Sequence, residues 1–147
     1  MEKPGGMSHM FPCSDSNPQS TAVVLVTHGD AGRDMIQAAE SFLQLSIPCL
    51  VSVGVEPKDT PSDVDRKIDL ALQKLHVLDR KQVLFLVDLV GSTPARLCCG
   101  HCDEKGHVVT GVNLPMLLKL ATTDRSKSAV VLAQELVATG ARSIHQE

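Results

Sequence analysis

Two side chains with complementary chemistry, His28 and Asp88, each follow a short apolar run that has the character of a buried strand. Neutral imidazole has an unperturbed pKa of about 6.5 and is a good nucleophile near neutral pH. A carboxylate beside one ring nitrogen could accept its N–H, fix the tautomer and leave the other lone pair available. His28 is therefore the predicted nucleophile, and Asp88 is the predicted orienting group.

The loop that follows Asp88 is the predicted phosphate-binding segment. Gly91, Ser92 and Thr93 offer hydroxyl and backbone N–H groups at a point where a helix is expected to begin. A helix N-terminus attracts negative charge, so this segment suits a phosphoryl group. Asp30 is expected to serve in a turn or cap. The wall of the site is assigned to three further residues, Gly29, Asn113 and Pro115.

Four apolar runs must position these groups, namely residues 22–26, 49–55, 83–87 and 107–112. They are continuous rather than alternating, as expected for strands covered on both faces. Amphipathic helical stretches follow them, including residues 33–43 and 128–139. This order predicts an α/β fold with an open, mostly parallel sheet of about four strands and helices on both faces. In such sheets ligands bind outside the carboxyl ends of the strands, where the predicted nucleophile lies.

Size and composition limit the possible functions. The 147 residues suit one domain, expected at residues 21–147 after a disordered leader or cloning remnant at residues 1–20. A formal charge of -3 gives no basic field, so nucleic-acid binding is not expected. No apolar run approaches the roughly 20 residues that span a bilayer. We therefore expect a cytoplasmic protein without direct membrane insertion.

The cysteines and the remaining histidines allow one alternative site. Three of the five cysteines crowd the run Cys98-Cys99-Gly100-His101-Cys102, whose thiols and imidazole could bind zinc. The usual Cys-x-x-Cys pair is displaced in this run, and no second ligand pair follows downstream, so no metal is expected. All thiols are expected to be reduced, and His101 and His107 to face solvent. No dinucleotide fingerprint or P-loop occurs, so no cofactor is expected.

Three stretches of the sequence together resemble a known family. Residues 24–32 (Val-Leu-Val-Thr-His-Gly-Asp-Ala-Gly), 83–94 (Val-Leu-Phe-Leu-Val-Asp-Leu-Val-Gly-Ser-Thr-Pro) and 109–118 (Val-Thr-Gly-Val-Asn-Leu-Pro-Met-Leu-Leu) are similar in order and spacing to the signature blocks of mannose-type IIA components. These proteins, of mannose, fructose or sorbose type, serve the bacterial phosphoenolpyruvate-dependent sugar phosphotransferase system. The resemblance extends from about Thr21 to the C-terminus.

The resemblance implies a phosphotransferase that works through a phosphohistidine. His28 would accept phosphate from the phosphocarrier protein HPr and pass it to a IIB component of a membrane-associated sugar-uptake complex. Asp88 would match the orienting carboxylate, and Thr93 the phosphoryl-contacting hydroxyl. The resemblance also implies a homodimer in which the segment after Gly140 pairs, as a swapped edge strand, with the sheet of the other subunit.

Two departures and two alternatives accompany the resemblance. Ser92 stands where the family usually has a second glycine, which could stiffen the loop, and Arg96 stands where asparagine is common, which could alter partner choice. One alternative is the related phosphocarrier subunit of dihydroxyacetone kinases, which has a histidine at the same strand end. The other is a regulatory binding module in which phosphorylated His28 changes what the protein binds.

Overall fold

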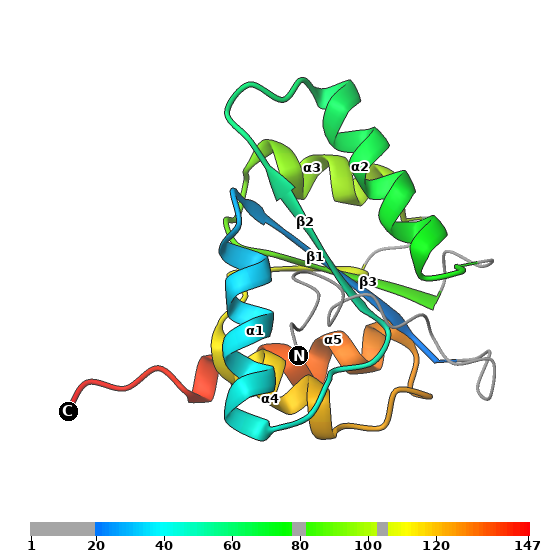
Figure 1. Ribbon diagram of the computed structural model, residues 1–147. Coiled ribbons are helices and arrows are strands. Elements are labelled where there is room, and N and C mark those ends of the chain that lie inside the picture. The colour runs from blue at the N-terminus through cyan, green and yellow to red at the C-terminus, as the bar shows by residue number, and fades with distance from the viewer. Residues whose placement is uncertain (1–19, 78–81, 103–105) are drawn as a thin grey trace, which may run out of the picture.

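Strands and helices alternate along the chain in the computed structural model, which describes residues 20–77, 82–102 and 106–147. Apart from Ser20, the predicted leader lies outside these residues. The elements of the described chain, shown in Figure 1, are β1 Ala22–His28, α1 Ala31–Leu43, β2 Leu50–Val55, α2 Pro61–Lys74, β3 Val83–Val87, α3 Thr93–Gly100, β4 Val108–Thr110, α4 Leu114–Thr122 and α5 Ala129–Arg142.

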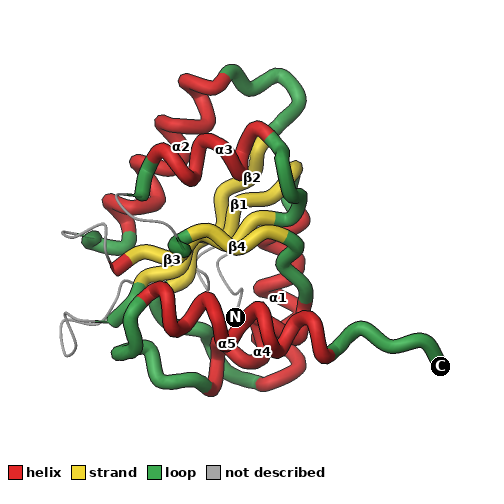
Figure 2. The backbone as a smooth tube through the Cα atoms, turned by 180° about the vertical axis from the view of Figure 1, so that it is seen from behind, coloured by secondary structure: helices red, strands yellow, loops and turns green. Residues whose placement is uncertain are grey.

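The strands form one parallel sheet in the order β2-β1-β3-β4. Figure 2 shows the sheet between two groups of helices. Strand β1 is central, and its last residue, His28, pairs in register with Val55 at the end of β2. On its other side, Val26 pairs with Val87 at the end of β3. The predicted parallel α/β fold is confirmed, and the sheet brings the carboxyl ends of β1, β2 and β3 to one edge.

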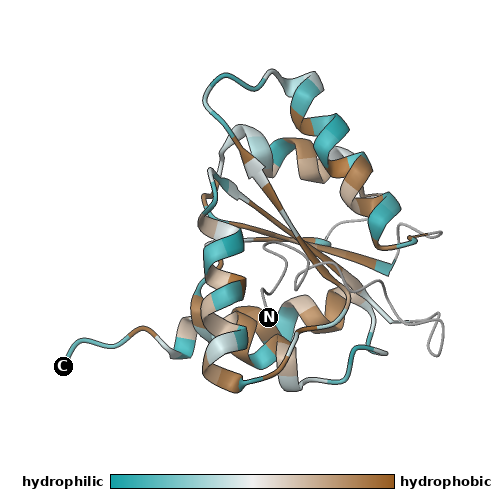
Figure 3. Ribbon diagram, in the orientation of Figure 1, coloured by the Kyte–Doolittle hydropathy of each residue, from teal (hydrophilic) through white to brown (hydrophobic). Residues whose placement is uncertain are grey.

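Both faces of the sheet are buried, which explains why its strands are continuously apolar. In β1, Val24 and Val26 pack toward helices α2 and α3, whereas Val23 and Leu25 pack toward α1, α4 and α5. Figure 1 shows the same two layers of helices, and in Figure 3 the central strands are mostly hydrophobic. Successive strand residues point to opposite faces, so burial on both sides requires an apolar residue at every position.

Side-chain caps start helices α2, α3 and α4, each of which follows a strand. Thr60 accepts a hydrogen bond from the backbone N–H of Asp63, whose carboxylate accepts one from the N–H of Thr60 in return. Ser92 and Asn113 each cap the next helix in the same way, accepting from the N–H three residues on. Such caps satisfy helix N–H groups that have no partner inside the helix.

Three boundaries differ from the sequence-based expectation. Strand β1 continues through His28 because its pairing with β2 continues to that residue. Strand β4 is shorter than expected because Gly111, with φ of +79°, turns the chain out of the sheet. Helix α5 runs through Gly140, where a Cβ atom would lie 2.8 Å from Met116 side-chain atoms, so this glycine permits close packing on α4. Residues 143–147 form no strand within the chain and extend from its body (Figure 1).

A buried arginine holds the opposite, amino-terminal edge of the sheet together. The Arg125 guanidinium donates hydrogen bonds to the backbone carbonyls of Thr21, Pro48 and Cys49, next to the starts of β1 and β2. Burial lowers the pKa of Arg125 to about 10. The hydrogen bonds of Arg125 therefore stabilise the side of the sheet opposite to His28.

Among the described residues, no helix has the length and apolarity needed to cross a membrane.

Candidate functional site

His28 lies at the end of the central strand, where both its backbone and its ring contact Asp88. The backbone N–H of His28 donates to Oδ2 of Asp88 at 2.9 Å, and ring atom Nδ1 lies 3.0 Å from the same oxygen. The His28 side chain is 50% exposed, whereas that of Asp88 is 22% exposed. The ring is thus held at Nδ1 by Asp88, which follows the neighbouring strand β3, and it remains accessible from solvent.

The Asp88 carboxylate is held by backbone amides as well as by the ring. Its Oδ1 accepts a hydrogen bond from the N–H of Leu89 at 2.9 Å. Partial burial alone would raise the pKa of Asp88, but the hydrogen bonds from the backbone and ring of His28 outweigh it and hold that pKa below the ordinary value. The ionised carboxylate only accepts hydrogen bonds, so Nδ1 of His28 must carry the proton. The lone pair of the ring therefore lies on Nε2.

A turn braced by hydrogen bonds follows His28 directly. Gly29 has φ of +55°, which favours glycine, and its N–H donates to the Val55 carbonyl at 2.8 Å. The Oγ1 atom of Thr27 accepts from the buried N–H of Gly32 at 2.7 Å and so ties the start of α1 to the strand. Sequence reasoning missed Thr27. Its position immediately before the strand-end histidine and five residues before Gly32 was the available signal.

The predicted phosphate-binding loop connects Asp88 to helix α3. Gly91 has φ of +70°, and the extended backbone of Ser92 suits a residue that caps a helix. The Ser92 hydroxyl donates to the Leu89 carbonyl at 2.8 Å and accepts from the N–H of Ala95 at 3.3 Å. Serine thus braces the loop at the position where the family usually has glycine.

Backbone N–H groups in this loop are available to a ligand. In the described part of the chain, the N–H groups of Gly91, Ser92 and Thr93 donate no hydrogen bond to a protein acceptor. They lie at the N-terminus of α3, where the helix dipole favours an anion. The guanidinium of Arg96 donates to the hydroxyl of Thr93 at 3.3 Å, so a cation stands beside the same hydroxyl. This end of α3 can therefore hold a phosphoryl group.

The predicted wall residues differ in their surroundings. Gly29 lies directly after the nucleophile, in the turn described above. Asn113 caps α4 and donates through Nδ2 to the Gly140 carbonyl at 3.3 Å, which ties α4 to α5. Pro115 stands in the first turn of α4. No hydrogen bond or ion pair between the described residues joins Asn113 or Pro115 to His28. Asp30 forms an exposed pair with Arg33, with Oδ2 and Nη2 3.0 Å apart.

Two expectations about other histidines were wrong. His107 is buried, and its Nδ1 lies 2.9 Å from the Val83 carbonyl, because the residue enters the sheet beside β3. His101, at the end of α3, has a side chain that is only 10% exposed, and its Nε2 lies 2.9 Å from Asp65 of α2. The helix-to-helix contact, which no local pattern indicates, removes its ring from solvent.

The expectation of reduced thiols also needs one correction. Cys49 is disulfide-bonded, whereas Cys98 and Cys99 are not. Burial raises the pKa of Cys98 to about 12, so this thiol is unreactive near neutral pH. Among the described residues, no group of three or more side chains is arranged to hold a metal ion.

Comparison with known proteins places this arrangement in a family. The family model described as "PTS system fructose IIA component", where PTS denotes the phosphotransferase system, matches residues 22–137. The chain belongs to this family. The resemblance recognised from the three sequence blocks is thereby confirmed, and this IIA protein is a phosphotransfer component of the sugar phosphotransferase system. No curated protein matches the sequence significantly.

Solved structures share the fold of this IIA protein. The mannose/sorbose-specific IIA subunit of Enterococcus faecalis is 21% identical, with a TM-score of 0.75 over 87% of this chain and 95% of that one. A IIA protein associated with the fucose utilization operon of Streptococcus pneumoniae is also 21% identical, with a TM-score of 0.69 over 85% and 91% of the two chains. A sigma-54 interaction domain protein of Enterococcus faecalis is 14% identical, with a TM-score of 0.63 over 84% and 92%.

Proposed function

We propose that this IIA protein is a phosphohistidine carrier that accepts a phosphoryl group from HPr on Nε2 of His28 and passes it to a IIB component. One observation carries the proposal. The ionised Asp88 carboxylate occupies Nδ1 at 3.0 Å, which leaves the lone pair on Nε2 of a ring that is half exposed. A nucleophile with a fixed tautomer and open access suits transfer between proteins.

The transfer step is a substitution at phosphorus. The Nε2 lone pair of His28 attacks the phosphorus of phosphorylated HPr while the bond from phosphorus to the donor nitrogen breaks, and the electron pair of that bond stays on the donor. The His28 ring, still protonated at Nδ1, acquires positive charge as the new bond forms. The Asp88 carboxylate stabilises that charge through the existing Nδ1 contact. Transfer onward to IIB reverses these roles, with His28 as the leaving group.

The loop before α3 supplies the complementary anion site. The N–H groups of Gly91, Ser92 and Thr93 would hold the phosphoryl oxygens, and the hydroxyl of Thr93 would add a further donor. These groups are fixed before the phosphate arrives, because Ser92 braces the loop against Leu89 and Ala95. A preorganised set of donors stabilises the charge of the transferring group without reorganisation.

We further propose a cytoplasmic homodimer. Helix α5 exposes Val137, and Ile144 beyond it is 76% exposed. Both line a cavity of about 200 Å³ beside β4, and pairing of two chains would cover this apolar surface.

The direct test is reconstitution. Phosphoenolpyruvate, enzyme I and HPr together should place one phosphoryl group on this protein, and the modification should be labile in acid and stable in base, as expected for a phosphoramidate. A IIB protein from a mannose-type system should then discharge it. A chain that stays unmodified in this mixture, while a known IIA protein is charged in parallel, would contradict the proposal.

A further inference from the structure

The carboxyl end of β2 contacts the turn that carries His28. Thr27 pairs in register with Gly54, and the Gly29 carbonyl folds back over this glycine. A Cβ atom at Gly54 would lie 2.6 Å from the Gly29 oxygen, a separation that real side chains do not reach. The same strand end accepts the Gly29 N–H through the Val55 carbonyl. The end of β2 therefore determines where the chain leaves His28.

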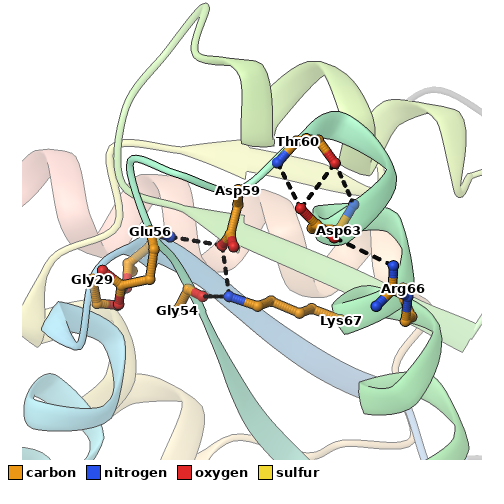
Figure 4. A network of polar contacts seen from close by, with 9 residues as sticks. Gly29, Gly54, Glu56, Asp59, Thr60, Asp63, Arg66 and Lys67 are labelled. Atoms are coloured by element: carbon orange, nitrogen blue, oxygen red, sulfur yellow. Dashed lines mark hydrogen bonds and ion pairs between the residues drawn. The ribbon is translucent and has the colours of Figure 1, made fainter.

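A charged network from α2 fixes this strand end on its other side. Figure 4 shows that Nζ of Lys67 donates to the Gly54 carbonyl at 2.9 Å and to Oδ2 of Asp59 at 2.6 Å. The same Asp59 oxygen accepts the N–H of Glu56 at 2.8 Å, which closes the turn after β2. The Asp59 side chain is only 8% exposed, and its pKa is lowered chiefly by the hydrogen bond from Lys67.

The network lies along the outer side of β2, an outermost strand of the sheet. Because β2 is an edge strand among the described residues, its outward carbonyls have no neighbouring strand there to bond, and the Gly54 carbonyl is bonded by a side chain of α2 instead. Lys67 therefore connects the position of α2 to the position of Gly54. Gly54 in turn contacts Gly29, which is bonded in sequence to His28 (Figure 4).

We propose that Lys67 and Gly54 are positioning residues for phosphoryl transfer, acting through the Gly29 turn to aim the His28 ring at the phosphorus. This inference rests on the proposed carrier function. Neither residue touches the reacting atoms. Lys67 holds the end of β2 in place, and the missing side chain of Gly54 gives the Gly29 carbonyl the room that the turn requires. In-line transfer is sensitive to such placement, since errors near 1 Å cost about 100-fold in rate.

The first test compares two lysines of one helix. Lys67→Met keeps the length of the side chain but removes the donor to Gly54 and Asp59. Lys74→Met is the matched control, because Lys74 lies on the same helix and lines, with Lys67, a cavity of about 230 Å³ between α2 and β2, but bonds to neither Gly54 nor Asp59. We expect Lys67→Met to lower the saturating single-turnover rate of charging by HPr about 10-fold while the half-saturating HPr concentration stays constant. Lys67→Arg, which retains a cationic donor, should restore most of the rate.

The second test acts on the contact itself. Gly54→Ala places a methyl group against the Gly29 carbonyl, and we expect a loss of about 100-fold in the same rate. NMR of the imidazole nitrogens should show a changed His28 signal in Gly54→Ala and Lys67→Met, but not in Lys74→Met. A purely structural role would lower thermal stability and leave both the rate and the His28 signal of the folded variant unchanged.

The outcomes separate this inference from the carrier function. If the wild-type protein charges on His28 and Lys67→Met charges at the rate of Lys74→Met, the positioning role is wrong and the carrier function stands. If the wild-type protein does not charge, the carrier function itself fails. Should Gly54→Ala not fold, the Lys67 series alone decides, because it leaves the backbone contact unchanged.

Discussion

In the described part of the chain, two short histidine–aspartate contacts have nearly equal lengths and different consequences. Nδ1 of His28 lies 3.0 Å from Asp88, and Nε2 of His101 lies 2.9 Å from Asp65. The first pair joins two parallel strand ends, whereas the second joins two helices. The His28 side chain is 50% exposed, and that of His101 only 10%. Distance alone therefore does not identify the reactive pair.

The two pairs differ in what surrounds the second ring nitrogen. In His28 the second nitrogen, Nε2, is left with its lone pair, and the anion-binding loop follows directly from the orienting aspartate. In His101 the second nitrogen, Nδ1, lies 3.7 Å from Asp69, so carboxylates face both sides of the ring. An anionic phosphoryl group would be repelled from that position. The pair proposed to react is therefore the one that has an accessible lone pair and nearby N–H donors.

The largest expected difference between the pairs concerns the histidines themselves. His28→Ala should abolish charging by HPr, because no other ring combines an accessible nitrogen with an anion site in the described chain. His101→Ala should charge at close to the wild-type rate but lose about 1–2 kcal/mol in the free energy of unfolding. Intact-mass measurement of phosphorylation and denaturant unfolding check both results. Normal charging of His28→Ala would remove the distinction between the pairs.

The next difference concerns the aspartates. Asp88→Asn keeps the size of the side chain but loses its charge, and its NH2 group can turn toward the ring and favour the wrong tautomer. We expect the HPr-to-His28 step to slow on the order of 100-fold with the fold intact. Asp65→Asn is the matched change at the His101 pair. It should leave the rate of the HPr-to-His28 step within about a factor of 2, since Asp65 contacts neither the His28 ring nor the loop before α3. Rapid-quench kinetics measure both, and equal rates for the two variants would reduce Asp88 to a structural cap.

A smaller effect is expected from a change in the loop before α3, which follows Asp88 and has no counterpart at the His101–Asp65 pair. Thr93→Val removes one hydroxyl while the backbone N–H groups remain, so charging should slow roughly 10-fold. The same rapid-quench measurement checks this result. A loss as large as that of Asp88→Asn would mean that the hydroxyl, rather than the backbone, carries most of the phosphate binding.

The smallest effect is a dependence of stability on pH. Because the pKa of Asp88 is lowered in the folded protein, its contribution to stability is present above the unfolded value of about 3.9 and is lost as pH falls through the lower folded value. The difference in the free energy of unfolding between wild type and Asp88→Asn should therefore be constant above about pH 5 and shrink in stronger acid. Denaturant titrations across this range measure it, and a difference that grows in acid would give the pKa shift the opposite sign.

The sequence predicted the sheet and the contact between His28 and Asp88 because local patterns encode both. Continuous apolar runs identified the strands, and the parallel arrangement then required the ends that carry His28 and Asp88 to meet. Contacts that depend on register or on packing between helices had no such pattern. The approach of Gly29 to Gly54 follows from how β1 pairs with β2, and the burial of His101 follows from how α3 packs on α2.

Asn113 shows the same limit at the fourth strand. Its place after an apolar run predicted a wall of the site, and that role stays a prediction. Its observed contacts, the cap of α4 and the hydrogen bond to the Gly140 carbonyl of α5, depend on packing between helices and have no local pattern. The contact that the sequence did predict is the one between His28 and Asp88, which lie at the ends of the central strands β1 and β3.

The most direct test is to determine which nitrogen carries the phosphate. Protein labelled with heavy nitrogen in its histidines and charged through HPr should show, by NMR, a phosphoryl group bound to Nε2 of His28 while Nδ1 keeps its proton toward Asp88. Phosphate on Nδ1 of His28, or on a ring nitrogen of His101, would contradict the assignment of Asp88 as the group that orients the nucleophile.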